Sequence, residues 1–172
     1  MVFVTVGSAP QSFRRLLEAV DAIAGTGGFG QRRVFMQIGH AGGFTPIHCE
    51  YRPFLTREEF DQFLREADFV VSHGGATALE IIRAKKPAIV MPRRKRYGEI
   101  MNDHQVEFVE ALAADGWVIP AMQPEDLRSA IVHAISMCGR VRPAARSSMV
   151  ALVSQAMDEL LGNPSAPQCN AA

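Results

Sequence analysis

Short hydrophobic runs alternate along this chain with longer segments in which hydrophobic residues recur every three or four positions. The runs are rich in β-branched residues and stop at glycine, proline or polar residues, which is typical of buried strands. They predict strands over Val2–Val6, Arg33–Ile38, near Ile47–Tyr51, Asp68–Ser72, Pro87–Met91 and Trp117–Ile119.

The segments between the runs have the spacing of amphipathic helices, as in Phe13, Leu16, Leu17, Val20 and Ile23. Thr56 and Glu59 match a capping box, which predicts a helix that begins there. The remaining helices are predicted over Ser12–Ala24, Thr77–Lys85, Asp103–Asp115 with closure at Gly116, Pro124–Met137 and about Pro143–Leu161.

Strands that alternate with helices predict an α/β fold, a Rossmann-like parallel sheet of about six strands with helices on both faces. We expect one domain over residues 1–161 and a disordered tail over residues 162–172. Ligands of such sheets bind at the carboxyl ends of the strands. Three loops at that edge carry unusual residues: Gly7-Ser8, Ser72–Thr77 and Pro92–Gln105.

Composition narrows the class of protein. The 172 residues contain 18 basic and 18 acidic side chains, so no global charge indicates a nucleic-acid or membrane partner. Three widely spaced cysteines predict free thiols in a reducing compartment. No apolar run reaches the length of a membrane span, and a strand opens the chain where a signal peptide would lie. We therefore expect a soluble, cytoplasmic protein.

The segment SHGGATALE, residues 72–80, takes a buried strand through two glycines into a helix. Glycines let the backbone approach a ligand closely, and a helix N-terminus offers N–H groups to a phosphate. Thr77 and Glu80 are three residues apart and share a helix face, where Glu80 can accept hydrogen bonds from sugar hydroxyls. A plain glycine-rich turn explains the same segment.

Asn102–Gln105 places four polar residues at a helix start, where they either cap the helix or bind several hydroxyl groups. The basic run Arg93–Arg96 precedes it. Such a run marks a solvated face, a nucleic-acid patch or a contact with anionic lipid, and its place after a strand also suits a negative substrate. Arg93, Arg94 and Arg96 would suit a uronate carboxylate.

Other motifs give weaker signals. The glycines of Gly25–Gly30 imitate a dinucleotide fingerprint but follow a helix instead of a strand, so we interpret them as a turn. The five histidines have no metal-ligand spacing, and we expect neither a metal nor a cofactor. His40 follows a predicted strand and is a weak candidate for a general base, with a structural role favoured.

Four segments together resemble the C-terminal, donor-binding half of GT-B glycosyltransferases of family 28: VFVTVGS, FMQIGH, the stretch from ADFVVSHGG to RRKRYGE, and NDHQVEFVEAL. The similarity runs in order over about residues 2–120. Of the two kinds of short subunit that the chain resembles, the bacterial one, from two-component exopolysaccharide and capsule glycosyltransferases, is the closer. The similarity extends to the catalytic subunit of the eukaryotic two-subunit UDP-GlcNAc transferase.

The resemblance implies roles for residues at matching positions. Gly7 and Ser8 would line the diphosphate end of a UDP-sugar site, and Glu80 would bind the ribose. The diphosphate would be held by His73, Gly74, Gly75, Ala76 and Thr77. The donor sugar would meet Asp103, His104 and Gln105, with Arg93 also in the substrate-binding set.

The expected function is therefore that of a donor-binding, catalytic subunit of an inverting UDP-sugar glycosyltransferase. The acceptor would be a polyprenyl-diphosphate-linked saccharide in exopolysaccharide or capsule synthesis. A membrane-anchored partner would supply the acceptor half and hold this chain at the inner face of the membrane, and no nucleic acid is expected. Two alternatives stay open: a non-catalytic UDP-sugar-binding regulator, and a UDP-sugar epimerase or hydrolase of related fold.

Overall fold

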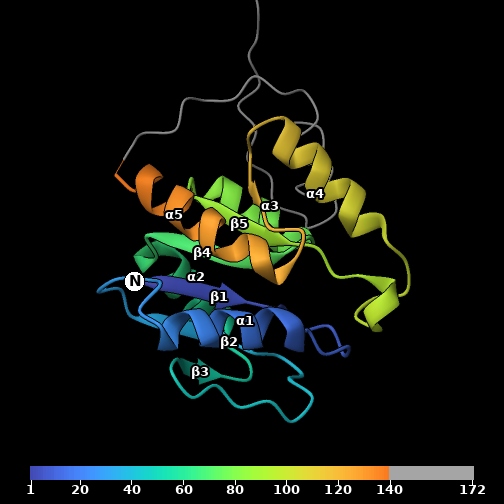
Figure 1. Cartoon of the computed structure of the whole chain (residues 1–172), viewed down its shortest axis with the longest axis horizontal. Coiled ribbons are helices and arrows are strands. Elements are labelled where there is room, and N and C mark those ends of the chain that lie inside the picture. Colours follow the sequence, from blue (N-terminus) through green and yellow to red (C-terminus); the bar gives the residue numbers. More distant parts are fainter. Residues whose placement is uncertain (140–172) are drawn as a thin grey trace, which may run out of the picture. The chain divides into compact units, whose positions relative to one another are not determined.

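The computed structural model describes residues 1–139, and the predicted helix over Pro143–Leu161 and the predicted tail lie outside that range. Its six strands form one sheet with the order β3-β2-β1-β4-β5-β6 (Figure 1). The strands are β1 Val2–Thr5, β2 Val34–Gln37, β3 Glu50–Arg52, β4 Phe69–His73, β5 Ala88–Met91 and β6 Ile119–Pro120. The helices are α1 Arg14–Gly25, α2 Arg57–Glu66, α3 Ala76–Arg83, α4 His104–Ala114 and α5 Leu127–Met137, with short 3₁₀ turns at Lys95–Tyr97 and Pro124–Asp126.

Every neighbouring pair of strands is parallel, which confirms the predicted Rossmann-like sheet. From β1 the chain moves outward through β2 to β3, returns to β4 beside β1, and continues through β5 to β6. The direction of winding therefore reverses between β1 and β4. In open α/β sheets, a ligand binds at the carboxyl ends of the strands beside this switch point.

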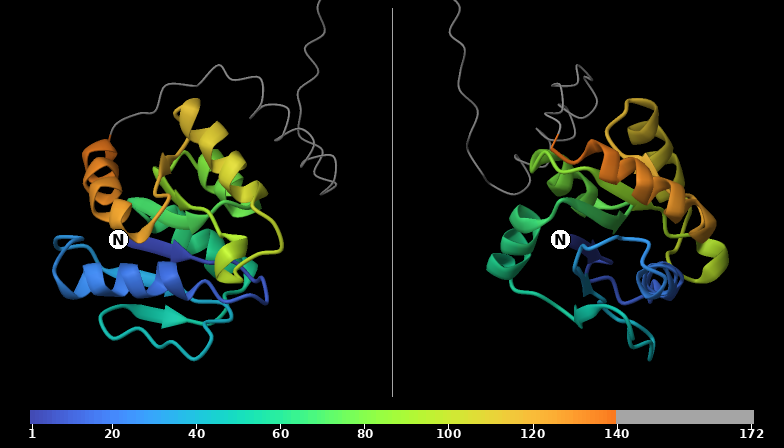
Figure 2. Two further views of the ribbon diagram at one scale, coloured as in Figure 1. Left: turned by 45° about the vertical axis from the view of Figure 1, so that its right-hand side comes forward. Right: turned by 60° about the vertical axis from the view of Figure 1, so that its left-hand side comes forward.

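Successive side chains along β1 pack alternately against the helices on the two faces of the sheet. Val2 and Val4 belong to the aliphatic core formed with α1 and α5, in which Leu17 and Leu127 are fully buried. Phe3 points to the other face and packs on the α2 rings of Phe60 and Phe63, at centroid distances of 5.4 and 5.6 Å. The views in Figure 2 show α1 and α5 on one face of the sheet and α2 on the other.

Most element predictions are confirmed, with shifted ends. The capping box of Thr56 and Glu59 is formed at the start of α2. The predicted Pro124 helix begins instead as a 3₁₀ turn, and its α-helical part starts at Leu127. The sixth strand is Ile119–Pro120, not Trp117–Ile119, because only these residues pair with β5. The glycines after α1 form a turn, as expected.

Candidate functional site

A cavity of about 230 Å³ opens at the carboxyl ends of β1 and β2 on the α2 and α3 side, and we call it the switch-point cavity. It lies beside the reversal of strand order, where the fold predicts a ligand. Of the residues predicted from the sequence, Gly7, Ser8, Thr77 and Glu80 line it together. The other lining residues are Thr5, Gln37, Leu55, Thr56, Arg57 and Phe60.

The floor of the cavity is polar because two strands end in buried hydrogen-bonding side chains. Thr5 and Gln37 are opposite each other in the register of β1 and β2. The Thr5 hydroxyl donates to the Gln37 side-chain oxygen at 2.8 Å, and Gly7 N–H donates to the same hydroxyl at 3.2 Å. These bonds fix the start of the glycine loop after β1.

His73 ends β4, and its ring lies between two glycine loops. A Cβ atom added at Gly7 would lie 2.8 Å from its Cε1, and one added at Gly75 would lie 2.7 Å from its Nε2. Gly7 also has φ +71°, so a side chain there would be strained as well as blocked. The two glycines therefore make room for the imidazole between the loops.

Burial, with the nearby positive charge of Arg93, lowers the pKa of His73 from 6.5 to about 4. The imidazole is consequently neutral at physiological pH. Any interaction with an anion would use a ring N–H instead of a full positive charge.

The N-terminus of α3 faces the same edge of the sheet. Its N-cap residue is Gly75, which has no side chain to satisfy the first-turn N–H groups. A Cβ atom at Gly74 would lie 2.6 Å from Val109 and 3.1 Å from the Gln105 carbonyl oxygen, so this glycine lets α3 approach α4 closely. Ala76, at the helix start, is exposed. The helix end is thus open to an anionic ligand.

Glu80, one turn into α3, is partly exposed and forms an ion pair with Arg57 of α2, at 2.9 Å. Arg57 could not be recognised from the sequence, because its only sequence signal is a position beside the Thr56 cap. The fold alone brings α2 and α3 together at the cavity.

The structure corrects the interpretation of Arg93. The predicted basic run included it, yet this side chain is only 2% exposed. Its guanidinium donates to the carbonyl oxygens of Val6, Gln11 and Glu99, at 2.9, 2.8 and 3.2 Å. Arg93 therefore holds the loop after β1 to the loop after β5 and is not free to bind a substrate. The solvent-facing part of the run is confined to Arg94–Arg96.

The predicted sugar-binding residues are divided between surface and interior. Gln105 is buried, and its side-chain oxygen accepts from Arg93 N–H at 3.1 Å. Asp103 and His104 are exposed at the start of α4. Asp103 accepts from Lys95 N–H at 2.8 Å, and the His104 ring contacts Asn102. None of these residues lines the switch-point cavity, although Gln105 lies against Gly74.

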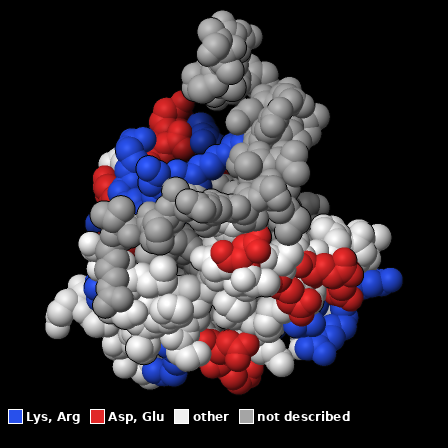
Figure 3. Space-filling model, turned by 90° about the horizontal axis from the view of Figure 1, so that it is seen from above, with Lys and Arg blue, Asp and Glu red and all other residues white. Residues whose placement is uncertain are grey.

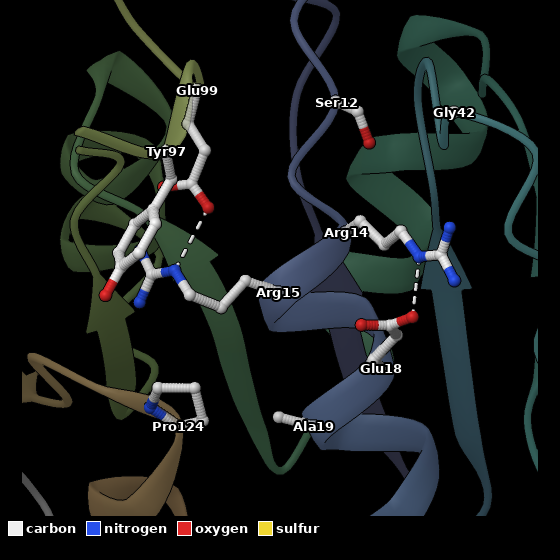
Figure 4. Close-up of a pocket in the computed structure, with 9 residues that line it drawn as sticks. All are labelled: Ser12, Arg14, Arg15, Glu18, Ala19, Gly42, Tyr97, Glu99 and Pro124. Carbon is white, nitrogen blue, oxygen red and sulfur yellow. Dashed lines mark hydrogen bonds and ion pairs between the residues drawn. The ribbon is translucent and has the colours of Figure 1, made fainter. Parts of the chain in front are cut away.

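A larger cavity of about 620 Å³ lies beside α1 and the loop after β5 (Figure 4). Its cations are already engaged: Arg15 pairs with Glu99 at 2.9 Å, and Arg14 pairs with Glu18. Arg15 also donates to the Pro92 carbonyl oxygen. This cavity contains none of the predicted binding residues, so its size alone does not make it the candidate site.

Charges and metal ligands give no competing site in the described range. On the face seen in Figure 3, basic and acidic clusters lie near one another, and no single basic field forms. Within residues 1–139, no group of three or more His, Cys, Asp or Glu side chains could hold a metal ion.

His40 is exposed with its ring 5.1 Å from that of Phe54, and it does not line the switch-point cavity. Cys49 and Cys138 are free.

No helix among the described residues is both long and apolar enough to cross a membrane.

Comparison with known proteins identifies the family of this chain. Residues 1–160 match the model of the glycosyltransferase family 28 C-terminal domain. The chain is 30% identical over 128 residues to the UDP-N-acetylglucosamine transferase subunit ALG13 of Mus musculus. The aligned region covers 66% of this chain and 10% of that protein.

A second relative is the UDP-N-acetylglucosamine–N-acetylmuramyl-(pentapeptide) pyrophosphoryl-undecaprenol N-acetylglucosamine transferase of Synechococcus sp. (strain JA-2-3B'a(2-13)). It is 32% identical over 82 residues, covering 47% of this chain and 21% of that protein. This chain therefore spans only a small part of the length of these two relatives.

The same fold occurs in the solved structure of the glycotransferase of kitacinnamycin. The TM-score is 0.56 at 18% identity, over 94% of this chain and 39% of that one. At this identity the likeness shows a shared fold and nothing finer.

Proposed function

The chain belongs to glycosyltransferase family 28, whose C-terminal domain it contains, and on that premise we propose that it is the donor-binding subunit of an inverting UDP-sugar glycosyltransferase. The observation that carries the proposal is the switch-point cavity, which brings Gly7 and Ser8 of the loop after β1 together with Thr77 and Glu80 of α3. Both curated relatives described above are named as transferases of N-acetylglucosamine, which supports a UDP-sugar as the donor.

In the proposed site, the nucleotide lies across the carboxyl ends of β1 and β4. Glu80 accepts hydrogen bonds from the ribose, while Gly7, Ser8 and the start of α3 face the diphosphate. Negative charge grows on the diphosphate as the glycosidic bond breaks. A helix N-terminus and fixed N–H groups stabilise that charge without reorganising. His73 contributes as a neutral ring that is held between the two loops.

Arg93 stabilises this arrangement through buried hydrogen bonds. Its guanidinium bonds fix the loop that follows β1, so the positions of Gly7 and Ser8 depend on it. Gln105 in turn orients the Arg93 backbone. Asp103 and His104, exposed at the start of α4, remain proposed contacts of the donor sugar.

The proposed acceptor is a saccharide linked to polyprenyl diphosphate, in exopolysaccharide or capsule synthesis. The Synechococcus relative is named for a pyrophosphoryl-undecaprenol acceptor, and the mouse relative is named as a subunit, which together support a lipid acceptor and a partner chain. We place the acceptor half on a membrane-anchored partner, and this chain at the cytoplasmic face of the membrane through that partner.

Calorimetry with a panel of nucleotides tests the donor assignment. We expect binding of UDP and of one among UDP-glucose, UDP-galactose, UDP-glucuronate and UDP-GlcNAc, with GDP much weaker. Glu80→Ala should weaken UDP binding by about 1.5–3 kcal/mol, the scale of a hydrogen bond to a charged group. Equal affinity for UDP and GDP, or unchanged UDP affinity in the folded variant, contradicts the assignment.

A further inference from the structure

Three charged side chains form a row beside the switch-point cavity: Asp61, Arg57 and Glu80. Arg57 lies between the two acids and pairs with both, at 2.9 Å in each case. Arg57 and Glu80 also line the cavity. The row joins α2 to α3 through the ion pair of Arg57 and Glu80.

Arg57 is oriented by its own helix before it reaches α3. Its Nε and Nη2 donate to the two Asp61 oxygens at 3.0 and 2.9 Å, a two-point contact one helical turn away. Its guanidinium also lies over the Phe60 ring, 5.8 Å from the centroid. With the planar fork held in this way, Nη1 is the group directed at Glu80.

The ion pair engages one oxygen of the Glu80 carboxylate. Nη1 of Arg57 donates to Oε2 at 2.9 Å, which sets the rotation of the carboxylate and leaves Oε1 for a ligand. Arg57 also offsets negative charge near a site proposed to take an anion. Without it, the Glu80 carboxylate would line the cavity without the positive charge that it pairs with.

On the basis of the proposed function, we propose that Arg57 is a positioning residue that holds the Glu80 carboxylate for a ribose hydroxyl. In this way Arg57 determines how well the site distinguishes a ribonucleotide from a 2′-deoxyribonucleotide. Arg57 acts through Glu80 and does not itself bind the phosphates. A carboxylate that rotates freely is oriented to accept from the ribose hydroxyl for only part of the time. A carboxylate that is held in place keeps the orientation that this hydrogen bond needs.

The experiment compares UDP with 2′-deoxy-UDP by calorimetry on the full 172-residue chain and its variants. Wild type should bind UDP about tenfold more tightly than 2′-deoxy-UDP, as expected for a hydrogen bond to a charged group. Arg57→Gln should lose most of that preference by weakening UDP alone, and Glu80→Gln should abolish it. Arg57→Lys should be intermediate, because it keeps the charge without the planar fork.

Arg14→Gln is the matched control, since Arg14 is an equally exposed arginine that pairs with an acid four residues along, on α1. It should leave both affinities unchanged. The variants concern exposed or partly exposed side chains, and their melting temperatures should stay near that of wild type.

The outcomes separate this inference from the proposed function. If wild type fails to bind UDP, both are overturned. If wild type prefers UDP and Glu80→Gln removes the preference, but Arg57→Gln keeps it, the proposed site stands and the positioning role is wrong. A further outcome is that Arg57→Gln loses the same factor of affinity for both nucleotides, with a smaller loss when salt is added. That result would mean that Arg57 interacts with the charge of the diphosphate, and it would overturn the inference as well.

Discussion

At the scale of single residues, the surroundings of His73 change its protonation more than those of any other ionisable side chain in the candidate site. It ends a central strand, sits against two glycine loops and lies near the buried charge of Arg93. A ring in this setting stays neutral well below physiological pH. Its neutrality also limits repulsion between two positive groups beneath the loops.

This buried histidine predicts a loss of stability in mild acid. The pKa of His73 is about 4 in the folded protein against 6.5 for the ordinary side chain, so between these values only the unfolded chain takes up the proton. The free energy of unfolding therefore falls as the pH drops from about 6.5 toward 4, by about 3 kcal/mol at most from this group.

Urea unfolding at a series of pH values between 7.5 and 5 measures the effect. His73→Phe keeps a ring between the glycines and removes the titration, so its stability should change less with pH than that of wild type. His133→Gln, which removes an exposed histidine of α5, is the control and should behave as wild type does. An unchanged slope in His73→Phe would contradict the assignment.

At the scale of elements, the loop from Arg94 to Met101 is built to present a surface. Beneath it, Glu99 pairs with Arg15 and accepts from Arg94 N–H at 2.9 Å. Above, Tyr97 and Met101 are 49% and 77% exposed, beside the exposed cations Lys95 and Arg96. Cations next to exposed apolar side chains suit the surface of an anionic membrane.

We therefore predict that Lys95→Gln with Arg96→Gln weakens binding of the assembled pair to anionic vesicles, by about 1 kcal/mol for each charge removed. Affinity for a soluble UDP-sugar should not change. Vesicle sedimentation and calorimetry measure the two quantities. Arg93 is left intact, because its buried side chain holds two loops together.

Arg65→Gln with Lys85→Gln is the matched control for this experiment. It removes two exposed cations at the other end of the strands, one near the end of α2 and one after α3. This pair should retain vesicle binding. Loss of donor affinity with intact vesicle binding in the Lys95 and Arg96 variant would instead place those cations in the donor site.

At the scale of the whole molecule, the described residues form one Rossmann-like sheet with one candidate donor site. A GT-B reaction holds donor and acceptor between two such halves, and positioning of the two reactants supplies much of the rate. Under the proposed function, the described part of this chain supplies the donor half.

Measurement of radiolabelled sugar transfer to a lipid-linked acceptor tests this division. The chain alone should bind a UDP-sugar weakly and transfer almost none of it, and a membrane-anchored partner with the acceptor half should restore transfer. Glu80 and His104 variants of the restored pair should lose activity; a regulator would tolerate them. Full turnover by the purified chain alone would overturn the division into halves.

The carboxyl-end face of the sheet is the expected contact with that partner. From the sequence we also predict that Met149, Val150, Leu152 and Val153 take part in this contact; these residues lie outside the described range.

The sequence by itself determined the order of elements and the loops that carry the candidate site. Strand runs, helical spacing and the Thr56–Glu59 capping box depend on residues close along the chain, so they can be recognised without knowing the fold. The same holds for the glycines of the strand-to-helix turn after β4, which predict a close approach of the backbone to neighbouring groups, as the structure has it. These local signals also placed Gly7, Ser8, Thr77 and Glu80 at one edge of the sheet, where they line one cavity.

Only the tertiary structure decided what the arginines do. Arg93 and Arg96 are alike in a basic run, yet one is buried against carbonyl groups of the first loop and the other is exposed. Arg57 gained its partner from a helix 23 positions further along. A long charged side chain is placed by whichever carbonyl and carboxylate groups the packed sheet brings within its reach. Those groups come from distant segments, so no local pattern in the sequence specifies them.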